Sequence, residues 1–179
     1  MKSLREMSIG EIAARVAEHL RQSGINVVLT GGSCVSIYTD NRYQSYDLDF
    51  VEEGRSGRKK IAGVLVKLGF KEKDRYFIHP DTPFFVEFPA GPLAIGDEPV
   101  REVATLQFST GSLRLLSCTD CVKDRLAHYY HWKDRQCLDQ AVMVATVTEV
   151  DLEEIERWSR HEGVEEEFHR IREMLLAKT

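Results

Sequence analysis

The sequence predicts an α+β fold with two parts: strands and helices over residues 1–117, and helices alone over residues 118–179. The first observation is that segments with the two-residue period of strands stand between segments of helical period in the first part. The second is that no proline and only one glycine, Gly163, occur from Thr119 to the end of the chain. Because proline and glycine interrupt helices, the second part is expected to form several helices in succession.

Helices in the first part are marked by their caps and apolar stripes. Ser8 and Glu11 have the spacing of a capping box, apolar residues follow at helical spacing, and Gly24 ends the segment. A short helix is expected over residues 33–38, and a longer one that ends at Gly69. Strands are expected over residues 26–30, 46–51, 76–78, 84–88, 103–108 and 113–116, the last two as a hairpin.

Four helices are expected in the second part, each with its own apolar face. Asp151 begins the third of them as an N-cap, Glu154 completes a capping box, and Gly163 ends it. The apolar faces contain Val122 and Leu126, Leu138 and Val142, Ile155 and Trp158, and finally Phe168, Ile171 and Leu175.

Composition and charge exclude several classes of protein. The 179 residues include 24 Lys and Arg against 29 Asp and Glu, a net charge of −5, which argues against extended binding to DNA. No apolar run reaches the roughly 18–20 residues that span a bilayer, and the N-terminus has no apolar secretory core. We therefore expect a cytoplasmic protein without membrane contact. The four cysteines are expected to be reduced thiols.

The most informative segment is a glycine turn, Gly31-Gly32-Ser33, between an expected strand and an expected helix. Glycine lets a phosphate approach the backbone closely, and free amides at a helix N-terminus favour negative charge. The Ser33 hydroxyl adds a donor for a phosphate oxygen. The turn is therefore a candidate phosphate-binding site, although a Gly-Gly-Ser sequence on its own is usually only a turn.

Three acidic residues lie in two of the expected strands. Asp47 and Asp49 are two residues apart, so both carboxylates leave the same face of one strand, and Glu87 is the only acid in the apolar segment 84–88. Oxygen ligands of this kind suit Mg²⁺, and three carboxylates can hold two ions for phosphoryl transfer. Each acid also has an ordinary interpretation, as a solvated sheet face or an edge-strand charge. Their occurrence together with the glycine turn favours the metal site.

This pattern resembles the nucleotidyltransferase superfamily that shares the fold of DNA polymerase β. The family motif contains a glycine–serine turn, an Asp-x-Asp pair and a later carboxylate, whose places are occupied here by Gly32-Ser33, Asp47, Asp49 and Glu87. The resemblance covers roughly residues 25–160. It implies a mixed sheet flanked by helices and followed by a C-terminal helical bundle.

The resemblance also assigns nucleotide-binding residues. Arg42 resembles the arginine that precedes the Asp pair in many bacterial members. Lys123 and Lys133 resemble lysines in the helical region of small bacterial nucleotidyltransferase-like proteins, which include abortive-infection toxins. Together with the Gly31-Gly32-Ser33 turn, these residues are expected to bind the phosphates of a nucleoside triphosphate. The implied activity is Mg²⁺- or Mn²⁺-dependent transfer of a nucleoside monophosphate to a hydroxyl of an RNA, a protein or a small molecule.

A second hypothesis is a non-catalytic descendant of the same family that binds a partner. Such a protein would be one component of a toxin–antitoxin pair, with a cognate antitoxin-like protein as its partner. A non-catalytic copy has no chemical need to keep the glycine turn and the three carboxylates, and this chain keeps all of them.

Two further clusters in the helical region each have two interpretations. One is either a zinc site or a set of reduced thiols packed as small apolar residues, and it contains Cys118, Cys121, His128, His131 and Cys137. The other is the aromatic and basic segment 129–135, which contains Trp132 and Arg135. Its rings either stack on a base or pack between helices.

Overall fold

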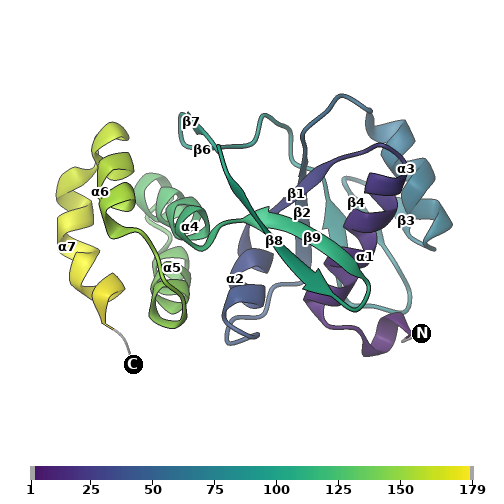
Figure 1. Ribbon diagram of the computed structural model, residues 1–179, viewed down its shortest axis with the longest axis horizontal. Helices are drawn as coiled ribbons and strands as arrows, with labels where there is room; N and C mark the ends of the chain where they lie inside the picture. The colour runs from purple at the N-terminus through teal and green to yellow at the C-terminus, as the bar shows by residue number, and fades with distance from the viewer. Residues whose placement is uncertain (1–2, 178–179) are drawn as a thin grey trace.

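The computed structural model describes residues 3–177, and its two parts lie side by side along the long axis of the molecule (Figure 1). A seven-stranded sheet with helices packed against it forms one part, and the C-terminal helices form the other. The fold is α+β, which confirms the predicted class. The first C-terminal helix begins at Cys118, directly after the last strand.

The sheet is mixed, with strand order β3-β4-β5-β2-β1-β9-β8. The strand β1 is antiparallel to β2 and parallel to β9, while β2 is parallel to β5. The strands are β1 Val27–Thr30, β2 Asp47–Glu52, β3 Lys71–Lys73, β4 Tyr76–Ile78, β5 Phe85–Glu87, β8 Val103–Phe108 and β9 Gly111–Leu116. A separate two-stranded sheet pairs β6 Ala94–Ile95 with β7 Glu98–Pro99.

Three α-helices belong to the sheet part: α1 Ile9–Gln22, α2 Gly32–Tyr38 and α3 Arg58–Lys67. The predicted capping box of α1 is confirmed, since Ser8 Oγ accepts from the Glu11 amide and the Glu11 carboxylate accepts from the Ser8 amide. Its apolar stripe faces the sheet, with Ile12 and Leu20 fully buried. The short helix α2 follows β1 directly and places the glycine turn at one end of the sheet.

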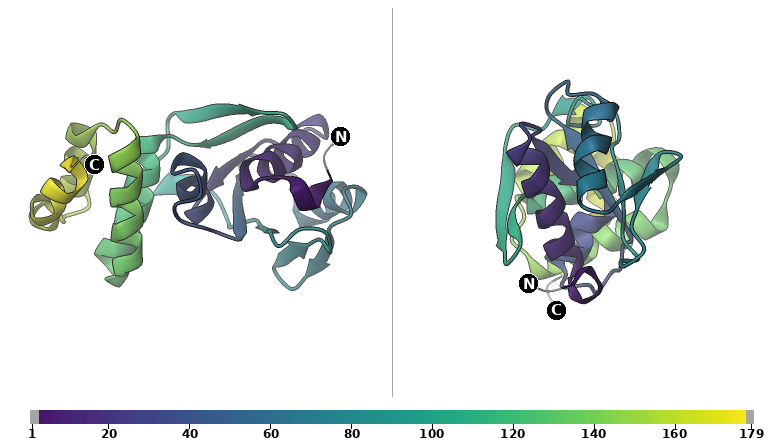
Figure 2. Two further views of the ribbon diagram at one scale, coloured as in Figure 1. Left: turned by 90° about the horizontal axis from the view of Figure 1, so that it is seen from below. Right: turned by 90° about the vertical axis from the view of Figure 1, so that its right-hand side faces the viewer.

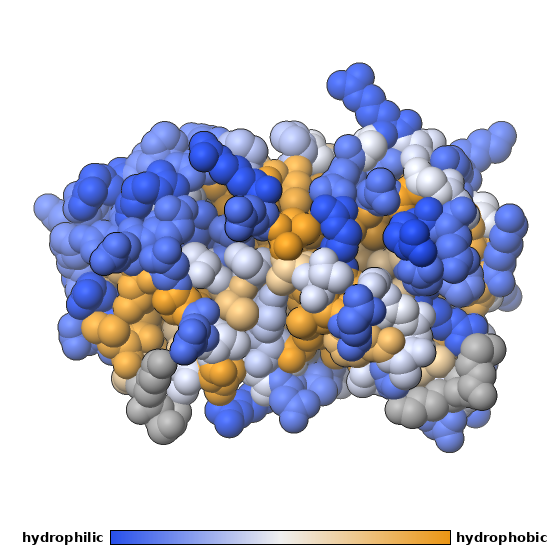
Figure 3. Space-filling view, in the orientation of Figure 1, coloured by the Kyte–Doolittle hydropathy of each residue, from blue (hydrophilic) through white to orange (hydrophobic). Residues whose placement is uncertain are grey.

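The four expected C-terminal helices are confirmed as α4 Cys118–Trp132, α5 Arg135–Val147, α6 Leu152–His161 and α7 Glu165–Leu176. The predicted N-cap of α6 is present, because the Asp151 side chain accepts from the Glu154 amide at 3.0 Å. Hydrophilic side chains cover most of α6 and α7 on the face shown in Figure 3. Within residues 3–177, no helix is both long and apolar enough to cross a membrane.

The structure contains elements that the sequence did not predict. The strand β3 consists of three exposed charged residues and has no apolar alternation. It forms because it pairs with β4 across a turn in which Asp74 has a φ of 55°. The two-residue strands β6 and β7, joined through Gly96, and a single 3₁₀ turn at Leu4–Glu6 were also not predicted.

Trp158 joins the helical part to the small β6–β7 sheet. Its side chain is fully buried, and the indole Nε1 donates to the carbonyl oxygen of Ile95 at 3.3 Å. The Tyr130 ring of α4 stacks beside it, with ring centroids 6.0 Å apart. The indole therefore occupies the centre of the contact between α4, α6 and β6.

Replacing Trp158 tests that central role. Trp158→Ala should lower the free energy of unfolding by about 3–5 kcal/mol, because it leaves a large cavity in a packed core. The matched control is Trp132→Ala, since Trp132 is 77% exposed and its loss should change stability by less than about 0.5 kcal/mol. Urea denaturation of both variants measures the difference, and similar losses for the two would contradict the assignment.

Candidate functional site

The glycine turn ends β1 and begins α2. Gly31 has a φ of 73° and a ψ of −158°, a conformation that is essentially restricted to glycine. A Cβ atom at Gly31 would lie 2.6 Å from Oδ2 of Asp49. Glycine is therefore required here both by the backbone conformation and by the close approach of the carboxylate.

The three predicted acids lie on one face of the sheet beside this turn, and their carboxylate oxygens do not all come within 4.8 Å of one another. Asp47 and Asp49 project from the same face of β2, while Leu48 on the opposite face is fully buried. Asp49 is paired in register with Glu87 across the parallel strands β2 and β5, so their side chains leave the same face of the sheet. All three acids line one cavity of about 490 Å³, together with Gly31 and Gly32.

Each of these carboxylates has a different environment. Asp47 accepts a hydrogen bond from the Ser45 hydroxyl, and Glu87 forms an ion pair with Arg75 in which Nε and Oε1 are 3.2 Å apart. Burial, and then the negative charges of Asp47 and Glu87, raise the pKa of the Asp49 carboxyl to about 7. The Asp49 carboxyl therefore binds a proton near neutral pH in the absence of a cation.

The donor set fits a hard divalent cation. All three groups offer oxygen ligands, as Mg²⁺ and Mn²⁺ prefer, and all three line the same cavity. A cation at this position would relieve the repulsion that raises the pKa of Asp49. The residues present could therefore hold the predicted metal.

The helical part supplies residues to the same cavity that were not predicted as part of this site. Asp124, Arg125 and His128 of α4 line it, as does Tyr43 from the segment before β2. The Arg125 side chain is largely buried, and its Nη2 lies 2.6 Å from Oδ2 of Asp124. A signal was present in the sequence, since Arg125 falls four residues after Cys121 on the apolar face of the helix.

Solved structures resemble the chain over most of its length. An antigenic nucleotidyltransferase-like protein from Paracoccidioides brasiliensis superposes with a TM-score of 0.58 at 13% identity, covering 95% of this chain and 93% of its own. The antibiotic-resistance factor ANT(2'')-Ia in solution gives 0.54 at 14% identity, covering 90% and 97%. Its crystal structure in complex with adenylyl-2''-tobramycin gives 0.51 at 13% identity, covering 83% and 92%. The chain has the nucleotidyltransferase fold.

The comparisons of sequence give no match to a family model or a curated protein, so the likeness to known proteins rests on structure. At 13–14% identity the likeness defines the architecture, which agrees with the resemblance noted from the sequence motifs.

The predicted nucleotide-binding residues have different positions in this fold. Gly31 and Gly32 line the carboxylate cavity. The Ser33 side chain is fully buried, and its hydroxyl donates to the carbonyl oxygen of Thr30 at 3.0 Å. Arg42 is exposed and is not among the residues that line the cavity. The structure thus places the two glycines in the same cavity as the acids, whereas the buried Ser33 side chain stabilises the turn through its hydrogen bond to Thr30.

The two predicted lysines lie outside the carboxylate cavity. The Lys123 ammonium is buried between Asp120 and Glu154, at 2.9 and 3.1 Å, beside a separate cavity of about 670 Å³. Lys133 is exposed at the end of α4 and lies 2.5 Å from a carboxylate oxygen of Glu167. Both ammonium groups are therefore neutralised by neighbouring acids of the helical part.

The cysteines and histidines of the zinc hypothesis do not converge. All four thiols are free, and those of Cys34, Cys121 and Cys137 are buried. Among residues 3–177, the one group of three possible ligands whose atoms all lie within 4.8 Å of one another is Glu156, Glu165 and His169. Arg160 already pairs with both glutamates of that group. The three buried thiols are therefore packed side chains of the interior.

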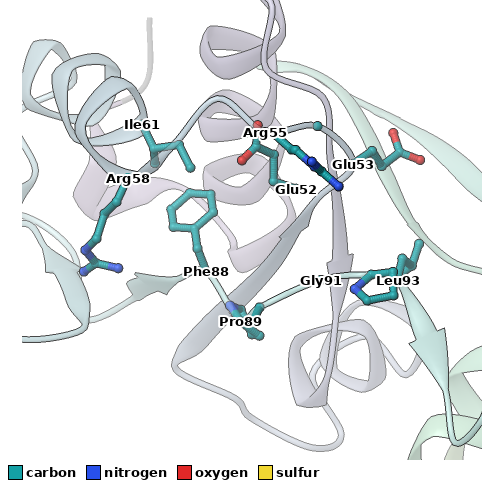
Figure 4. Close-up of a pocket in the computed structure, with 12 residues that line it drawn as sticks. Glu52, Glu53, Arg55, Arg58, Ile61, Phe88, Pro89, Gly91 and Leu93 are labelled. Carbon is teal, nitrogen blue, oxygen red and sulfur yellow. The ribbon is translucent and has the colours of Figure 1, made fainter.

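The largest cavity described adjoins the site without containing its acids. It has a volume of about 880 Å³ and lies between the start of α3 and the segment 88–93, with Ile61, Phe88 and Leu93 on its walls (Figure 4). Residues 89, 90, 92 and 93 also line the carboxylate cavity, so this segment is a shared wall. Asp47, Asp49 and Glu87 are not among the lining residues of the larger cavity.

Gly31→Ala tests the contact between the turn and Asp49. The positive φ of Gly31 should cost an alanine about 1–2 kcal/mol, and the collision with Asp49 should add to that loss. Gly57→Ala is the matched control, because Gly57 has a φ of 80° but nothing within 4 Å of its Cβ position. Thermal unfolding should show a larger loss for Gly31→Ala, and equal losses would contradict the contact.

Asp49→Asn tests the crowding of the acids. Because the folded chain holds a proton on Asp49 up to about pH 7, the free energy of unfolding should rise as the pH falls from about 7 to 4. Asparagine should remove this dependence and stabilise the protein at pH 8 by up to about 4 kcal/mol, since a tenfold change in proton affinity is worth about 1.4 kcal/mol. Urea titrations at several pH values measure it, with the exposed Asp97→Asn as a control that should leave the dependence unchanged.

Proposed function

We propose that the chain is a Mg²⁺- or Mn²⁺-dependent nucleotidyltransferase that moves a nucleoside monophosphate from a nucleoside triphosphate to a hydroxyl of an RNA, a protein or a small molecule. One observation carries the proposal: three carboxylates from β2 and β5 line one cavity of about 490 Å³ together with a glycine turn. That volume lies within the usual range of small-molecule sites.

Asp47, Asp49 and Glu87 are the residues that would hold the metal. When bound, Mg²⁺ neutralises charge on the phosphates and makes the acceptor hydroxyl more acidic. The Ser45 hydroxyl orients Asp47 for this role, and the raised pKa of Asp49 couples metal binding to the release of a proton.

The glycine turn is our candidate for holding the triphosphate. Backbone amides at the start of α2 would donate to phosphate oxygens, since no side chain at Gly31 or Gly32 obstructs them. Arg125 lines the cavity, so we assign the neutralisation of phosphate charge to it in preference to Lys123 or Lys133. Arg42, an exposed residue of the segment before β2, is our further candidate for a phosphate contact.

The transfer itself is a substitution at phosphorus. The acceptor oxygen forms a bond to the α-phosphorus, the bond from that phosphorus to its bridging oxygen breaks, and pyrophosphate leaves. The proton of the acceptor hydroxyl passes to a carboxylate, for which Glu87 is our candidate. Positioning and charge neutralisation supply most of the rate, as in other phosphoryl transfers.

Asp47→Asn tests the proposed activity. The variant should fold normally but lose at least about 100-fold in metal-dependent transfer, because one charged ligand is replaced by a neutral amide. The measurement incubates the protein with Mg²⁺, each α-labelled nucleoside triphosphate and a cell lysate, and follows both labelled products and pyrophosphate. Asp139→Asn, an exposed acid in α5, is the matched control and should retain full activity.

The same measurement separates the two functional hypotheses. Transfer by the wild-type protein that Asp47→Asn abolishes supports the enzyme. If the wild-type protein labels nothing and releases no pyrophosphate with any of the four triphosphates, the non-catalytic partner-binding hypothesis replaces it.

A further inference from the structure

The largest cavity described in the chain takes no part in the proposed transfer. Its volume of about 880 Å³ is within the usual range of small-molecule sites, and only residues between 52 and 93 line it. The helix α3, whose start forms one side of this cavity, faces the viewer in the right view of Figure 2, at the opposite end of the molecule from α6 and α7. The three acids of the candidate functional site are not among the lining residues, so a ligand bound here would not contact them.

One wall of this cavity is apolar and firmly held. The segment 88–93 has the sequence Phe-Pro-Ala-Gly-Pro-Leu, without a polar side chain. The Phe88 ring is anchored in the core, since it stacks on Phe50 with ring centroids 6.2 Å apart and lies edge-on to Phe77 at 5.9 Å. Ile61 of α3 adds a further apolar side chain to the lining (Figure 4). An apolar ligand body would therefore find a preformed surface to pack against.

Four charged side chains also line the cavity, and two of them are already neutralised. Glu53 forms an ion pair with Arg114 of β9, and Arg58 forms one with Glu72 of β3. Each of these charges has a partner of opposite sign in the fold. Neither is therefore available to a ligand without breaking an existing ion pair.

The other two charges, those of Glu52 and Arg55, form no ion pair with each other or with any other residue from 3 to 177. The Glu52 carboxylate accepts a hydrogen bond from the Ser56 amide at 2.7 Å, which leaves its negative charge in place, and Arg55 is exposed. In Figure 4 both side chains lie on one side of the cavity, across from Pro89 and Leu93. One free negative charge and one free positive charge thus stand opposite the apolar wall.

We propose that this cavity binds a small zwitterion with an apolar body, of which an apolar α-amino acid is the simplest example. The ligand carboxylate pairs with the Arg55 guanidinium, the ligand ammonium group pairs with the Glu52 carboxylate, and the apolar body packs against the segment 88–93. Glu52 repels a ligand that is only an anion, and Arg55 repels one that is only a cation, so a ligand with both charges satisfies both residues. This site is additional to the proposed transfer and does not depend on it.

The test measures the binding of probes that share one benzyl group, by ligand-observed NMR titration without metal or nucleotide. Phenylalanine has both charges, phenethylamine has only the ammonium group, and 3-phenylpropionate has only the carboxylate. Phenylalanine should bind the wild-type protein at least about threefold more tightly than either of the others, because each lacks one ion pair. Glycine, a zwitterion without an apolar body, should bind at least about tenfold more weakly than phenylalanine.

Two substitutions assign each charge of the ligand to its residue. Arg55→Gln should lower the affinity for phenylalanine to that for phenethylamine, and Glu52→Gln should lower it to that for 3-phenylpropionate. Glutamine at position 52 keeps the side-chain oxygen that accepts from Ser56, so the loop should keep its conformation. Lys59→Gln is the matched control, because Lys59 is an exposed cation of α3 that does not line the cavity, and it should bind every probe like wild type.

Absence of phenylalanine binding overturns the proposal, and so does equal affinity of the wild-type protein for phenylalanine, phenethylamine and 3-phenylpropionate. A preference for phenylalanine that survives in both Arg55→Gln and Glu52→Gln also overturns it, because the charges would then be recognised elsewhere. The proposed transfer can fail without affecting these results, since no probe is a nucleotide and no metal is added.

Discussion

Three carboxyl groups share one cavity beside a backbone turn, and several contacts in the site reduce the repulsion among them. Ser45 donates a hydrogen bond to Asp47, and Arg75 forms an ion pair with Glu87. The pKa of Asp49 is raised to about 7, so this carboxyl group keeps its proton up to about that pH. Gly31 allows Asp49 to come closer to the main chain than a side chain would permit. A divalent cation in this cavity would attract all three carboxyl groups, so their mutual repulsion would favour its binding.

Sequence reasoning identified the parts of the site that local signals define. The two-residue period placed Asp47 and Asp49 on one face, and the glycine turn followed from its own composition. The contribution of α4 was missed, because it depends on how the helical part packs beside the sheet. Arg125 gave a sign of this contribution, because it is a charged residue at a position where the helical pattern predicts an apolar one, and it is buried.

The difference between local signals and the packing of distant segments also explains why the surroundings of the lysines and the small strands were not predicted. Lys123 and Lys133 were assigned by resemblance, but two of the acids that pair with them, Glu154 of α6 and Glu167 of α7, lie 31 and 34 residues later in the chain. The strand β3 has no apolar pattern to reveal it, because it is an edge strand held by the main-chain hydrogen bonds of β4. The larger helices and central strands were predicted because each buries a periodic apolar face.

The anchoring of Ile95 by Trp158 has a mechanical result. The segment 89–94 forms one wall of the carboxylate cavity and leads directly into Ile95, while α4 forms another wall. Both walls are thereby fastened to the C-terminal helices, whereas the acids and the glycine turn belong to the sheet. The cavity thus lies between the sheet and the C-terminal helices. A tilt of these helices relative to the sheet would change both the width and the depth of the cavity.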